Sequence, residues 1–330
     1  MARLDVYEPL YMQNQSTWIG EIIAATPTVI AISDGFRQGD YYGNFKYKNG
    51  DIASGTVTNY NYFEGYAIQY SATGLKLNAK TVQNLVNSGN ADGLMALALN
   101  GNDIIDASSL GDTSPGEVEN TLWGFNGNDK IYGSAGIDDI SGGNGNDLIN
   151  GDEGDDILSG DNGNDVINGG NGVDILFGGD GNDKIYGGEG DDSLFGNNGN
   201  DVINGGNGDD LIFGELGKDT LTGGPGLNSF FFDTKLGSSN VDKITDFVSG
   251  DDTLFLDVSI FTNLPESLNL GDLADNLVIG TKALDSNDYL IFNPKTHSLS
   301  YDADASGAGK AVDFVILTGV NTISADDIWV

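Results

Sequence analysis

The chain has 330 residues, of which 50 are Asp or Glu and only 14 are Lys or Arg, so the formal net charge is −36. Glycine supplies 50 residues, cysteine is absent, and His297 is the single histidine. Disulfides, Cys-ligated zinc and multi-histidine metal sites are therefore excluded. So few cations cannot build the basic patch that nucleic acid or an anionic membrane requires, and we expect neither as a partner.

The first residues, MARLDVYEPLYMQ, contain Asp5 and Glu8 and no apolar stretch. This pattern is not that of a secretory signal peptide, and no later run approaches the roughly 20 apolar residues of a membrane span. We therefore predict no membrane insertion, and export from the cell would need another route.

Residues 1–97 are rich in aromatic residues and contain no repeat. Runs such as TVIAIS, GNFKYK, GTVTNYNYF and YAIQYSA predict antiparallel strands, followed by helices near Lys80–Val86 and Ala91–Ala98. These helices lead directly into the first repeat, so this segment is expected to cap the repeats. Its role is open.

Two features of this segment suggest a ligand or a reaction. A cluster of tyrosines is either a carbohydrate platform or a set of ordinary strand residues; its members are Tyr41, Tyr42, Tyr60, Tyr62, Tyr66 and Tyr70. Asp34, Asp40 and Glu64 could serve as acid and base in glycoside chemistry, but their spacing does not select them. No His, Cys, G-x-S-x-G or H-E-x-x-H lies in the segment, so protease and lipase activities lack their residues here; we predict that the protein is not an enzyme, with the N-terminal segment left open.

A nine-residue repeat dominates the middle of the chain. An outlier, ALNGNDIID at 98–106, precedes an interrupting polar segment at 107–123. Eleven copies then run without insertion from GFNGNDKIY at 124 to GELGKDTLT at 214, and a twelfth at 223 carries Asn228 in place of Asp. Gly occupies positions 1 and 4, Asp position 6, and Ile or Leu position 8 in all eleven.

This pattern predicts a six-residue turn and a three-residue strand in each unit, with glycine where φ is positive or the backbone approaches closely. Two units form one coil, and successive coils stack as parallel strands. The expected fold is all-β: a calcium-stabilised parallel β-roll with a β-rich N-terminal segment and a β C-terminal cap. The expected domains are 1–97, 98–123 (outlier and linker), 124–231 (roll) and 232–330 (cap).

The repeated carboxylates require a counter-ion. Stacked turns place the position-6 Asp residues of alternate units about 4.8 Å apart, where like charges repel strongly. Ca²⁺, bound by two carboxylates and turn carbonyls, resolves this repulsion, whereas Mg²⁺ keeps its waters and demands stricter geometry. A disordered Gly/Asp-rich linker is the alternative, and it describes the chain best without calcium. The predicted ligands are Asp129, Asp138, Asp147, Asp156, Asp165, Asp174, Asp183, Asp192, Asp201, Asp210 and Asp219.

The nonapeptide resembles that of the RTX (repeats-in-toxin) family, G-G-x-G-x-D-x-U-x. The resemblance implies two columns of calcium ions, about nine in all. Each ion would be held by the Asp and the carbonyls of positions 2 and 4 of one turn, and by the Asp and the carbonyls of positions 1 and 3 two units later. Phe125, Gly127 and Asp129 would thus share an ion with Gly142, Asn144 and Asp147.

The glycines implied at these sites are Gly127, Gly136, Gly142, Gly145, Gly151, Gly154, Gly160, Gly163, Gly169, Gly172, Gly178, Gly181, Gly187, Gly190, Gly196, Gly199 and Gly205. Position 2 departs from glycine in six units, where we expect strained or weaker turns, chiefly at the two ends; these residues are Phe125, Ser134, Asp152, Asp161, Asn197 and Glu215.

Residues 229–330 contain fewer glycines and several strand-like runs, including FFFDTK, VDKITDFVSGDDTLFLD, YLIFN, LSYDADASG and AVDFVILTGV. Three stretches, 242–247, 301–304 and 312–330, are similar to the segment that closes the roll in serralysin-type secreted proteins. Asp326-Asp-Ile-Trp-Val330 is similar to the uncleaved export signal of that family. The resemblance implies a secreted, extracellular protein exported by a type I (ABC) transporter.

Smaller motifs in this segment have simpler interpretations. Asp302-Ala-Asp304-Ala-Ser306-Gly307, with Asp313 twelfth, mimics an EF-hand loop but lacks the terminal Glu and the flanking helices, so a hairpin turn is favoured and calcium binding there stays open. Gly307-Ala-Gly309-Lys310 fails as a phosphate loop, because Asp304 and Ala311 occupy required Gly and Ser/Thr positions.

The outward positions of the roll differ between its two sheets. Even-numbered units place aromatic rings at position 9 and apolar residues at position 7, whereas odd units carry Asn at position 9. The aromatic residues are Phe177, Phe195 and Phe213. The apolar residues at position 7 are Ile157, Ile175 and Leu211, and the Asn residues of the odd units are Asn150, Asn168 and Asn204. Because soluble monomers rarely expose such a patch, we expect the Phe face to be covered by the N-terminal segment or by a partner.

The sequence therefore predicts a secreted calcium-binding protein that folds outside the cell and acts as an extracellular binding or structural module, with a carbohydrate or a protein as possible partner. The alternative is a secreted carbohydrate-active enzyme or carbohydrate-binding module that uses the N-terminal segment. A pore-forming toxin would need an apolar membrane segment, and an ice-binding solenoid would need a regular Thr array.

Overall fold

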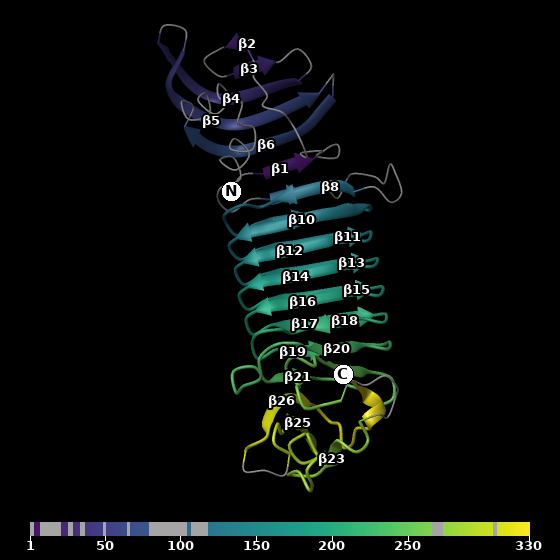
Figure 1. Ribbon diagram of the computed structural model, residues 1–330. Helices are drawn as coiled ribbons and strands as arrows, with labels where there is room; N and C mark the ends of the chain where they lie inside the picture. Colours follow the sequence, from purple (N-terminus) through teal and green to yellow (C-terminus); the bar gives the residue numbers. More distant parts are fainter. Residues whose placement is uncertain are drawn as a thin grey trace. The chain divides into compact units, whose positions relative to one another are not determined.

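The computed structural model of the chain describes residues 3–6, 21–25, 29–33, 37–48, 51–64, 67–78, 104–106, 118–265, 273–305 and 309–330. These residues are almost entirely β-structure, as predicted, with a single short 3-10 helix, η1 (Ala325–Asp327), among them (Figure 1). They form two compact units, residues 1–153 and residues 154–330. The predicted helices at Lys80–Val86 and Ala91–Ala98 lie outside the described residues.

The first unit begins with an antiparallel sheet in the order β2-β3-β4-β5-β6-β1. Its strands are β1 (Arg3–Val6), β2 (Glu21–Ala25), β3 (Val29–Ser33), β4 (Arg37–Lys48), β5 (Asp51–Glu64) and β6 (Ala67–Asn78). Strand β1 also pairs in parallel with β7 (Ile104–Asp106), the last three residues of the outlier repeat. The N-terminal sheet is therefore continuous with the strands of the repeats.

The repeats of the first unit form two parallel ladders. One joins β7, β9 (Lys130–Tyr132) and β11 (Leu148–Glu153), and the other joins β8 (Val118–Trp123) and β10 (Ile137–Asn144). Strand β8 corrects one expectation, because the final part of the interrupting segment is not a linker. It pairs with the repeats and buries Leu122, an apolar residue two places before the first repeat.

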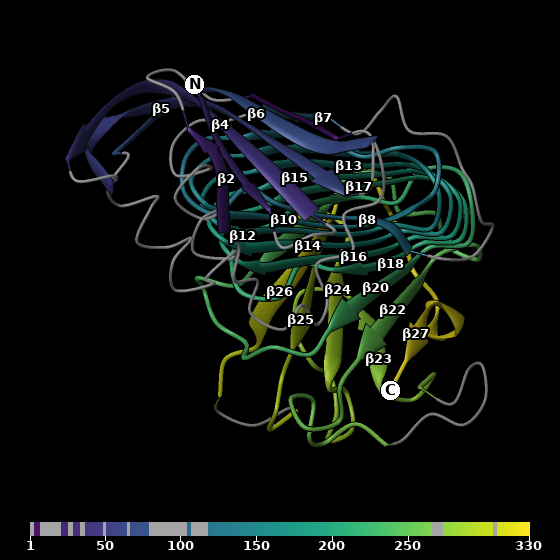
Figure 2. The same ribbon diagram turned by 90° about the horizontal axis from the view of Figure 1, so that it is seen from above.

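The second unit continues the same pattern, with paired residues 18 positions apart, as between Ile157 and Ile175 or between Val166 and Lys184. Seen along the stack, the strands of each ladder overlie one another (Figure 2). One ladder contains β13 (Val166–Asn171), β15 (Lys184–Glu189), β17 (Val202–Asn207) and β19 (Thr220–Thr222). The other contains β12 (Ile157–Asn162), β14 (Ile175–Asp180), β16 (Ser193–Asn198), β18 (Leu211–Phe213) and β20 (Ser229–Phe232).

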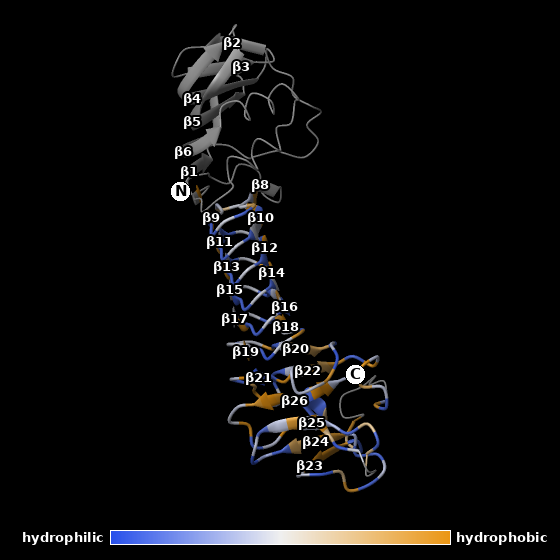
Figure 3. Ribbon diagram, turned by 90° about the vertical axis from the view of Figure 1, so that its left-hand side faces the viewer, coloured by the Kyte–Doolittle hydropathy of each residue, from blue (hydrophilic) through white to orange (hydrophobic). Residues whose placement is uncertain are grey.

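Both ladders of the second unit extend into the C-terminal segment. Strand β19 pairs with β21 (Asp242–Ile244), which pairs with β26 (Val312–Leu317), while β20 pairs with β22 (Thr253–Leu256), which pairs with β27 (Ile328–Trp329). Beyond β26, the sheet continues with β25 (Ser298–Tyr301), β24 (Leu290–Asn293) and β23 (Leu277–Ile279). Strands β22 and β26 carry the hydrophobic colour in Figure 3, whereas the turns of the repeats are hydrophilic.

The core of the repeats is a stack of the position-8 side chains. Each of them, from Ile131 to Leu221, is at most 1% exposed, which confirms the predicted inward position. Burial of one Ile or Leu contributes about 1.5–3 kcal/mol to the free energy of unfolding, so each added coil stabilises the stack. Large aromatic residues, including Phe261, Phe292 and Phe314, fill the core of the C-terminal segment. In both units the repeats thus form coils of a parallel β-solenoid that carries the turn residues on its edges.

Candidate metal centre

The position-6 Asp side chains are buried where each turn meets its strand, although Asp is among the residues least often buried. In all eleven repeats they are at most 3% exposed. The preceding turn determines this placement: position 5 stays at the surface, position 6 points inward, and position 7 enters the strand. The sequence prediction is confirmed in this respect, because every predicted Asp lies at the inner side of its turn.

Successive coils are linked through these carboxylates. The backbone N–H of Asp192 donates to Oδ1 of Asp210 at 3.0 Å, and that of Asp183 donates to Oδ1 of Asp201 at 2.8 Å. The same bond, between 2.7 and 3.0 Å, joins five further pairs within the units: 129/147, 156/174, 165/183, 174/192 and 201/219. One oxygen of each accepting carboxylate is therefore used by the stack.

The second oxygen, Oδ2, is buried without a hydrogen-bond partner among the described residues in six consecutive repeats of the second unit. These repeats contribute Asp174, Asp183, Asp192, Asp201, Asp210 and Asp219. A buried oxygen of this kind costs free energy unless a proton or a cation satisfies it. Six such atoms at a regular spacing indicate a repeated site for a ligand with positive charge.

The pKa values of these groups show how unfavourable the ionised state is without a counter-ion. Burial, reinforced by the charges of Asp219 and Asp183, raises the pKa of Asp201 to about 8. Burial, with the charges of Asp174 and Asp210 as neighbours, raises the pKa of Asp192 to about 7. At neutral pH a bound cation would remove this penalty, because it favours the ionised carboxylates.

Position 1 carries glycine because a side chain there would occupy the space in front of this oxygen. A Cβ on Gly196 would lie 2.7 Å from Oδ2 of Asp201 and 2.7 Å from the carbonyl oxygen of Gly214, one coil further on. Both distances are shorter than real Cβ atoms show, so a side chain at this position would have to displace one of these oxygens. The space that a side chain would fill is thus bounded by an orphaned carboxylate oxygen and a carbonyl oxygen, both of which are hard-cation ligands, and by Cδ1 of Ile203 at 3.3 Å.

The remaining donors of this set are also backbone oxygens. In the first turn pair, the Asn144 N–H donates to the carbonyl of Phe125, and the Gly127 N–H donates to the carbonyl of Asn144, both at 2.7 Å. Each carbonyl has a second lone pair for a cation. In the described part of the chain, no three Asp, Glu, His or Cys side chains converge on one point, so pairs of carboxylates with carbonyls are the available donor set. These residues fit calcium.

Position 2 adopts a left-handed backbone in most repeats, and of the two reasons expected for glycine at position 1, positive φ or close approach, the second applies. Positions 2 and 4, in contrast, have positive φ in every repeat except the second, which carries Ser134 and Gly136. Five of the six non-glycine residues predicted to be strained do lie in this region: Phe125 (φ 69°), Asp152 (88°), Asp161 (67°), Asn197 (65°) and Glu215 (64°). An L-residue there costs about 1–2 kcal/mol, less for Asn and Asp.

Ser134 is the exception at position 2, since its φ is not positive. Its backbone N–H and its hydroxyl both donate to Oδ2 of Asp138, at 2.6 and 3.3 Å. The oxygen that faces the vacant space in other turns is therefore engaged here. We expect the turn of Asp138 to bind calcium more weakly, in line with the predicted weakness at this end.

Sequence reasoning missed two carboxylates that extend the columns beyond the repeats. The Asp219 N–H donates to Oδ1 of Asp242 at 3.0 Å, and the Asn228 N–H donates to Oδ1 of Asp252 at 3.1 Å. Burial and the charge of Asp219 raise the pKa of Asp242 to about 8. The signal was present, because Asp242-Lys-Ile repeats the pattern of positions 6 to 8, as in Asp129-Lys-Ile.

Position 5 has a structural role that the sequence analysis also missed. The side-chain oxygen of Asn164 accepts the N–H of Asn182 at 2.8 Å, and that of Asn182 accepts the N–H of Asn200 at 2.8 Å. The series ends with the N–H of Lys218, which donates to Asn200 at 3.0 Å. This ladder ties the outer edges of the turns together and explains the frequent Asn and Asp at this position.

The predicted Phe ladder is present and longer than expected. Phe177, Phe195 and Phe213 stack with ring centroids 5.0 and 4.6 Å apart, and the ladder continues through Phe231 (4.2 Å), Phe255 (4.7 Å) and Trp329 (6.0 Å). Nearby, Ile157, Ile175 and Leu211 are 38–43% exposed. Each ring covers part of its neighbour, so the ladder shields much of its own apolar surface. Cover by another segment or by a partner stays a prediction.

Two of the three carboxylates suggested as acid and base lie on the neighbouring strands β4 and β5. Asp40 in β4 pairs with Asn61, and Glu64 in β5 pairs with Arg37, so these two are not cross-strand partners; Asp34 and Tyr66 lie outside the described residues. The register does place Tyr41 opposite Tyr60 and Tyr62 opposite Tyr70.

Asp302 and Asp304 form a turn after β25, and burial, together with Asp304, raises the pKa of Asp302. No helix flanks this turn on its described side, and the next residues, 306–308, lie outside the described ranges.

A parallel β-solenoid whose turns present paired, buried carboxylates to an oxygen-lined space is a calcium-binding β-roll. Comparison with known proteins agrees with this class. Residues 119–140, 132–167, 159–194, 168–203 and 195–229 match the family model of the RTX calcium-binding nonapeptide repeat (4 copies). Residues 119–229 are therefore RTX calcium-binding repeats.

Solved structures similar to the chain include two bacterial proteins. The extracellular lipase LipA from Serratia marcescens is 22% identical, with 78% of this chain and 51% of the lipase covered and a TM-score of 0.28. The AlgE6R3 subunit of the Azotobacter vinelandii mannuronan C5-epimerase is 20% identical, with 67% of this chain and 85% of the subunit covered and a TM-score of 0.21. The chain thus spans about half the length of the lipase. No curated protein matches it significantly.

Proposed function

We propose that the chain is a secreted RTX protein that folds outside the cell when calcium binds and then acts, without catalysis of its own, as an extracellular binding or structural module. The observation that carries the proposal is the series of six buried position-6 carboxylates, from Asp174 to Asp219, with orphaned Oδ2 atoms. A stack of this kind is unfavourable at neutral pH unless cations lie between its turns.

The residues of each pair of turns have separate tasks. Taking one pair, Asp192 and Asp210 would provide the charged ligands, the carbonyls of Gly188 and Gly190 would come from the lower turn, and those of Gly205 and Asn207 from the upper turn. Bound calcium supplies the positive charge that neutralises the two carboxylates. The chain's own contribution is to hold both turns in register through the Asp192 N–H bond to Asp210 and through the buried position-8 side chains.

This arrangement accounts for the proposed export route. Extracellular calcium modules have dissociation constants of about 10⁻⁴–10⁻³ M, far above the concentration of free calcium in the cytosol. The roll would therefore stay unfolded inside the cell and could pass through a type I (ABC) exporter, and its binding free energy would become folding free energy outside. No helix of membrane-spanning length and apolarity occurs in the described part of the chain.

A carbohydrate-binding role for the N-terminal sheet is the second candidate. It is supported by the register that places Tyr41 opposite Tyr60 and Tyr62 opposite Tyr70 on adjacent strands. Cross-strand aromatic pairs of this kind also stabilise a sheet by themselves, by about 0.2–1 kcal/mol each. A protein ligand for the same segment is the third possibility. For an enzyme that uses the carboxylates of this segment, the strand register offers no comparable pairing of Asp40 with Glu64.

The proposal is tested by far-UV circular dichroism and calorimetry of the full chain, first in chelator and then with titrated calcium. We expect a cooperative gain of β-structure in the range of about 0.1–1 mM calcium. Isothermal titration should show about nine bound ions, the number expected from the alternation of turns. Full β-structure in chelator at neutral pH would contradict both the role of calcium and the proposal that the chain folds only after export.

A further inference from the structure

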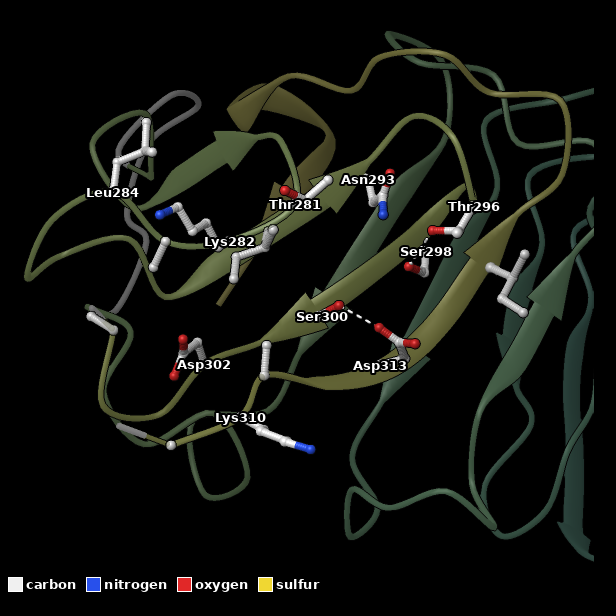
Figure 4. A pocket seen from close by; sticks show the side chains of 16 residues that line it. Thr281, Lys282, Leu284, Asn293, Thr296, Ser298, Ser300, Asp302, Lys310 and Asp313 are labelled. Carbon is white, nitrogen blue, oxygen red and sulfur yellow. Dashed lines mark hydrogen bonds between the residues drawn. The ribbon is translucent and has the colours of Figure 1, made fainter. Parts of the chain in front are cut away.

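A second site lies far from the calcium turns in sequence, on the sheet β24–β25–β26. A cleft of about 800 Å³ opens on one face of these strands (Figure 4). Strand register places Ile291, Ser300 and Asp313 in one row across the three strands. The residues that alternate with them, such as Phe292 and Leu299, are fully buried in the core on the opposite face.

The floor of the cleft carries polar side chains beside Ile291 and Ile316. Ser298 and Ser300 are only 7% and 6% exposed. Because their side chains are small, the cleft remains open above them. The Ser300 hydroxyl donates to Oδ1 of Asp313 at 2.5 Å, and the hydroxyls of Thr296 and Ser298 lie 2.9 Å apart. Because Ser300 gives its proton to Asp313, its lone pairs are free to accept hydrogen bonds from a ligand.

The walls are held in place by carboxylates outside the cleft. Asp288 accepts the N–H of Leu284 at 2.7 Å, and Asp304 accepts the N–H of Gly309 at 2.8 Å. These bonds fix the two segments that carry Lys282 and Lys310, the two cations that line the cleft. The cleft is therefore built from a sheet floor and two braced loops, which is the preorganisation that a binding site requires.

The charges that line the cleft balance, and this selects the class of ligand. Asp302 and Asp313 offset Lys282 and Lys310, and the other polar groups are hydroxyls and the amide of Asn293. A metal ion would meet the ammonium groups, an anion would meet the carboxylates, and an apolar ligand would remove water from these charged groups without replacing its hydrogen bonds. A neutral ligand that both donates and accepts many hydrogen bonds fits all of these groups.

We propose that this cleft binds a neutral mono- or disaccharide, whose hydroxyl groups exchange hydrogen bonds with Ser298, Ser300 and the two lysines. Its volume lies within the range of about 300–1,000 Å³ of small-molecule pockets. None of the described residues that line it is aromatic, so binding is expected to depend on hydrogen bonds with a dissociation constant of about 1 mM. This site is independent of the proposed calcium function and of the N-terminal tyrosines.

The test is saturation-transfer NMR on the calcium-loaded full chain with four probes: maltose, cellobiose, lactose and N,N′-diacetylchitobiose. We expect saturable binding of at least one probe. Ser300→Ala and Lys310→Ala should each weaken it by about tenfold, since each removes a hydrogen-bonding group of the cleft. Lys310 is exposed, so its replacement leaves the fold intact. Lys235→Ala is the matched control, because Lys235 is also exposed and lies outside the cleft.

Two results would overturn the assignment. One is the absence of saturable binding of all four sugars up to about 20 mM, a concentration well above the expected dissociation constant. The other is binding that survives both Ser300→Ala and Lys310→Ala, which would place the sugar elsewhere, for example on the N-terminal sheet. Equal melting temperatures of Lys310→Ala and Lys235→Ala in calcium ensure that a loss of binding reports on the cleft.

Discussion

The substitution Gly196→Ala tests the vacant space at position 1 most directly. Gly196 does not have a positive φ, so alanine is allowed by the backbone. Its methyl group, however, would lie 2.7 Å from both Oδ2 of Asp201 and the carbonyl oxygen of Gly214. Ordinary carbon–oxygen contacts are about 3.4 Å or longer, so the turn would have to move by several tenths of an ångström.

Two effects add to the cost. Overpacking of a close-packed site costs about 1–3 kcal/mol. Loss of one ion with a dissociation constant of about 0.1–1 mM costs a further 1.4–2.7 kcal/mol or so at 10 mM calcium. A total of about 3–5 kcal/mol should lower the melting temperature by about 6–20 °C, given about 2–4 °C per kcal/mol for a unit of this size.

The matched control is Gly237→Ala, because a Cβ on Gly237 meets no atom within 4 Å and its φ is not positive. Differential scanning calorimetry in 10 mM calcium, with isothermal titration to count ions, compares both variants with the parent chain. We expect Gly237→Ala to match the parent and Gly196→Ala to bind at least one ion fewer. An unchanged ion count and melting temperature in Gly196→Ala would refute the assignment of this space to calcium.

Three further predictions follow from the same turns and from the Phe ladder. Without calcium, the pKa values of Asp201 and Asp192, raised to about 8 and about 7, mean that the folded state binds protons more tightly than the unfolded state. In chelator, β-structure should therefore increase as the pH falls from 8 towards 4. In the presence of calcium, a lower pH should weaken calcium binding, because protons compete for the carboxylates. A circular dichroism signal that does not change with pH in chelator would argue against this. Asn228→Asp would complete two carboxylate pairs of the second column, with Asp210 and with Asp252, so titration should show up to two additional ions and calorimetry a higher melting temperature in calcium but a lower one in chelator. Phe195→Asp should cost about 1–3 kcal/mol by removing two ring stacks, with a change of oligomeric state if a partner copy covers the face; unchanged melting and an unchanged oligomer would exclude both roles.

The repeat made the roll predictable because each of its columns has one physical task. An Ile or Leu at position 8 has to point inward for a three-residue strand to bury anything, and all of them do. Asp at position 6 follows from the same alternation, since it lies two residues before position 8 on the same face. The periodicity therefore determined the coil, the register of 18 residues and the carboxylate columns before any contact was known.

What the sequence did not predict lies where the period breaks. Strand β8 has no nonapeptide, yet it pairs with β10 and buries Leu122 as the repeats do. Asp242 and Asp252 continue the columns after 23 and 24 residues instead of 18, so a search at a fixed period passes over them. The sugar cleft has no local signature, because Ser298, Ser300 and Asp313 come together only through the antiparallel register of β25 and β26.

The charge of the chain gains a physical reason from the proposed function. Nine divalent ions would offset half of the net charge of −36, and they would act where carboxylates are buried and closest together. Among the described residues, further acidic groups lie at exposed turn positions such as Asp155, Asp191 and Asp209, where water and salt screen them. The same acidity that opposes folding in the absence of calcium would then keep the folded protein soluble, so a single composition serves the unfolded and the folded state.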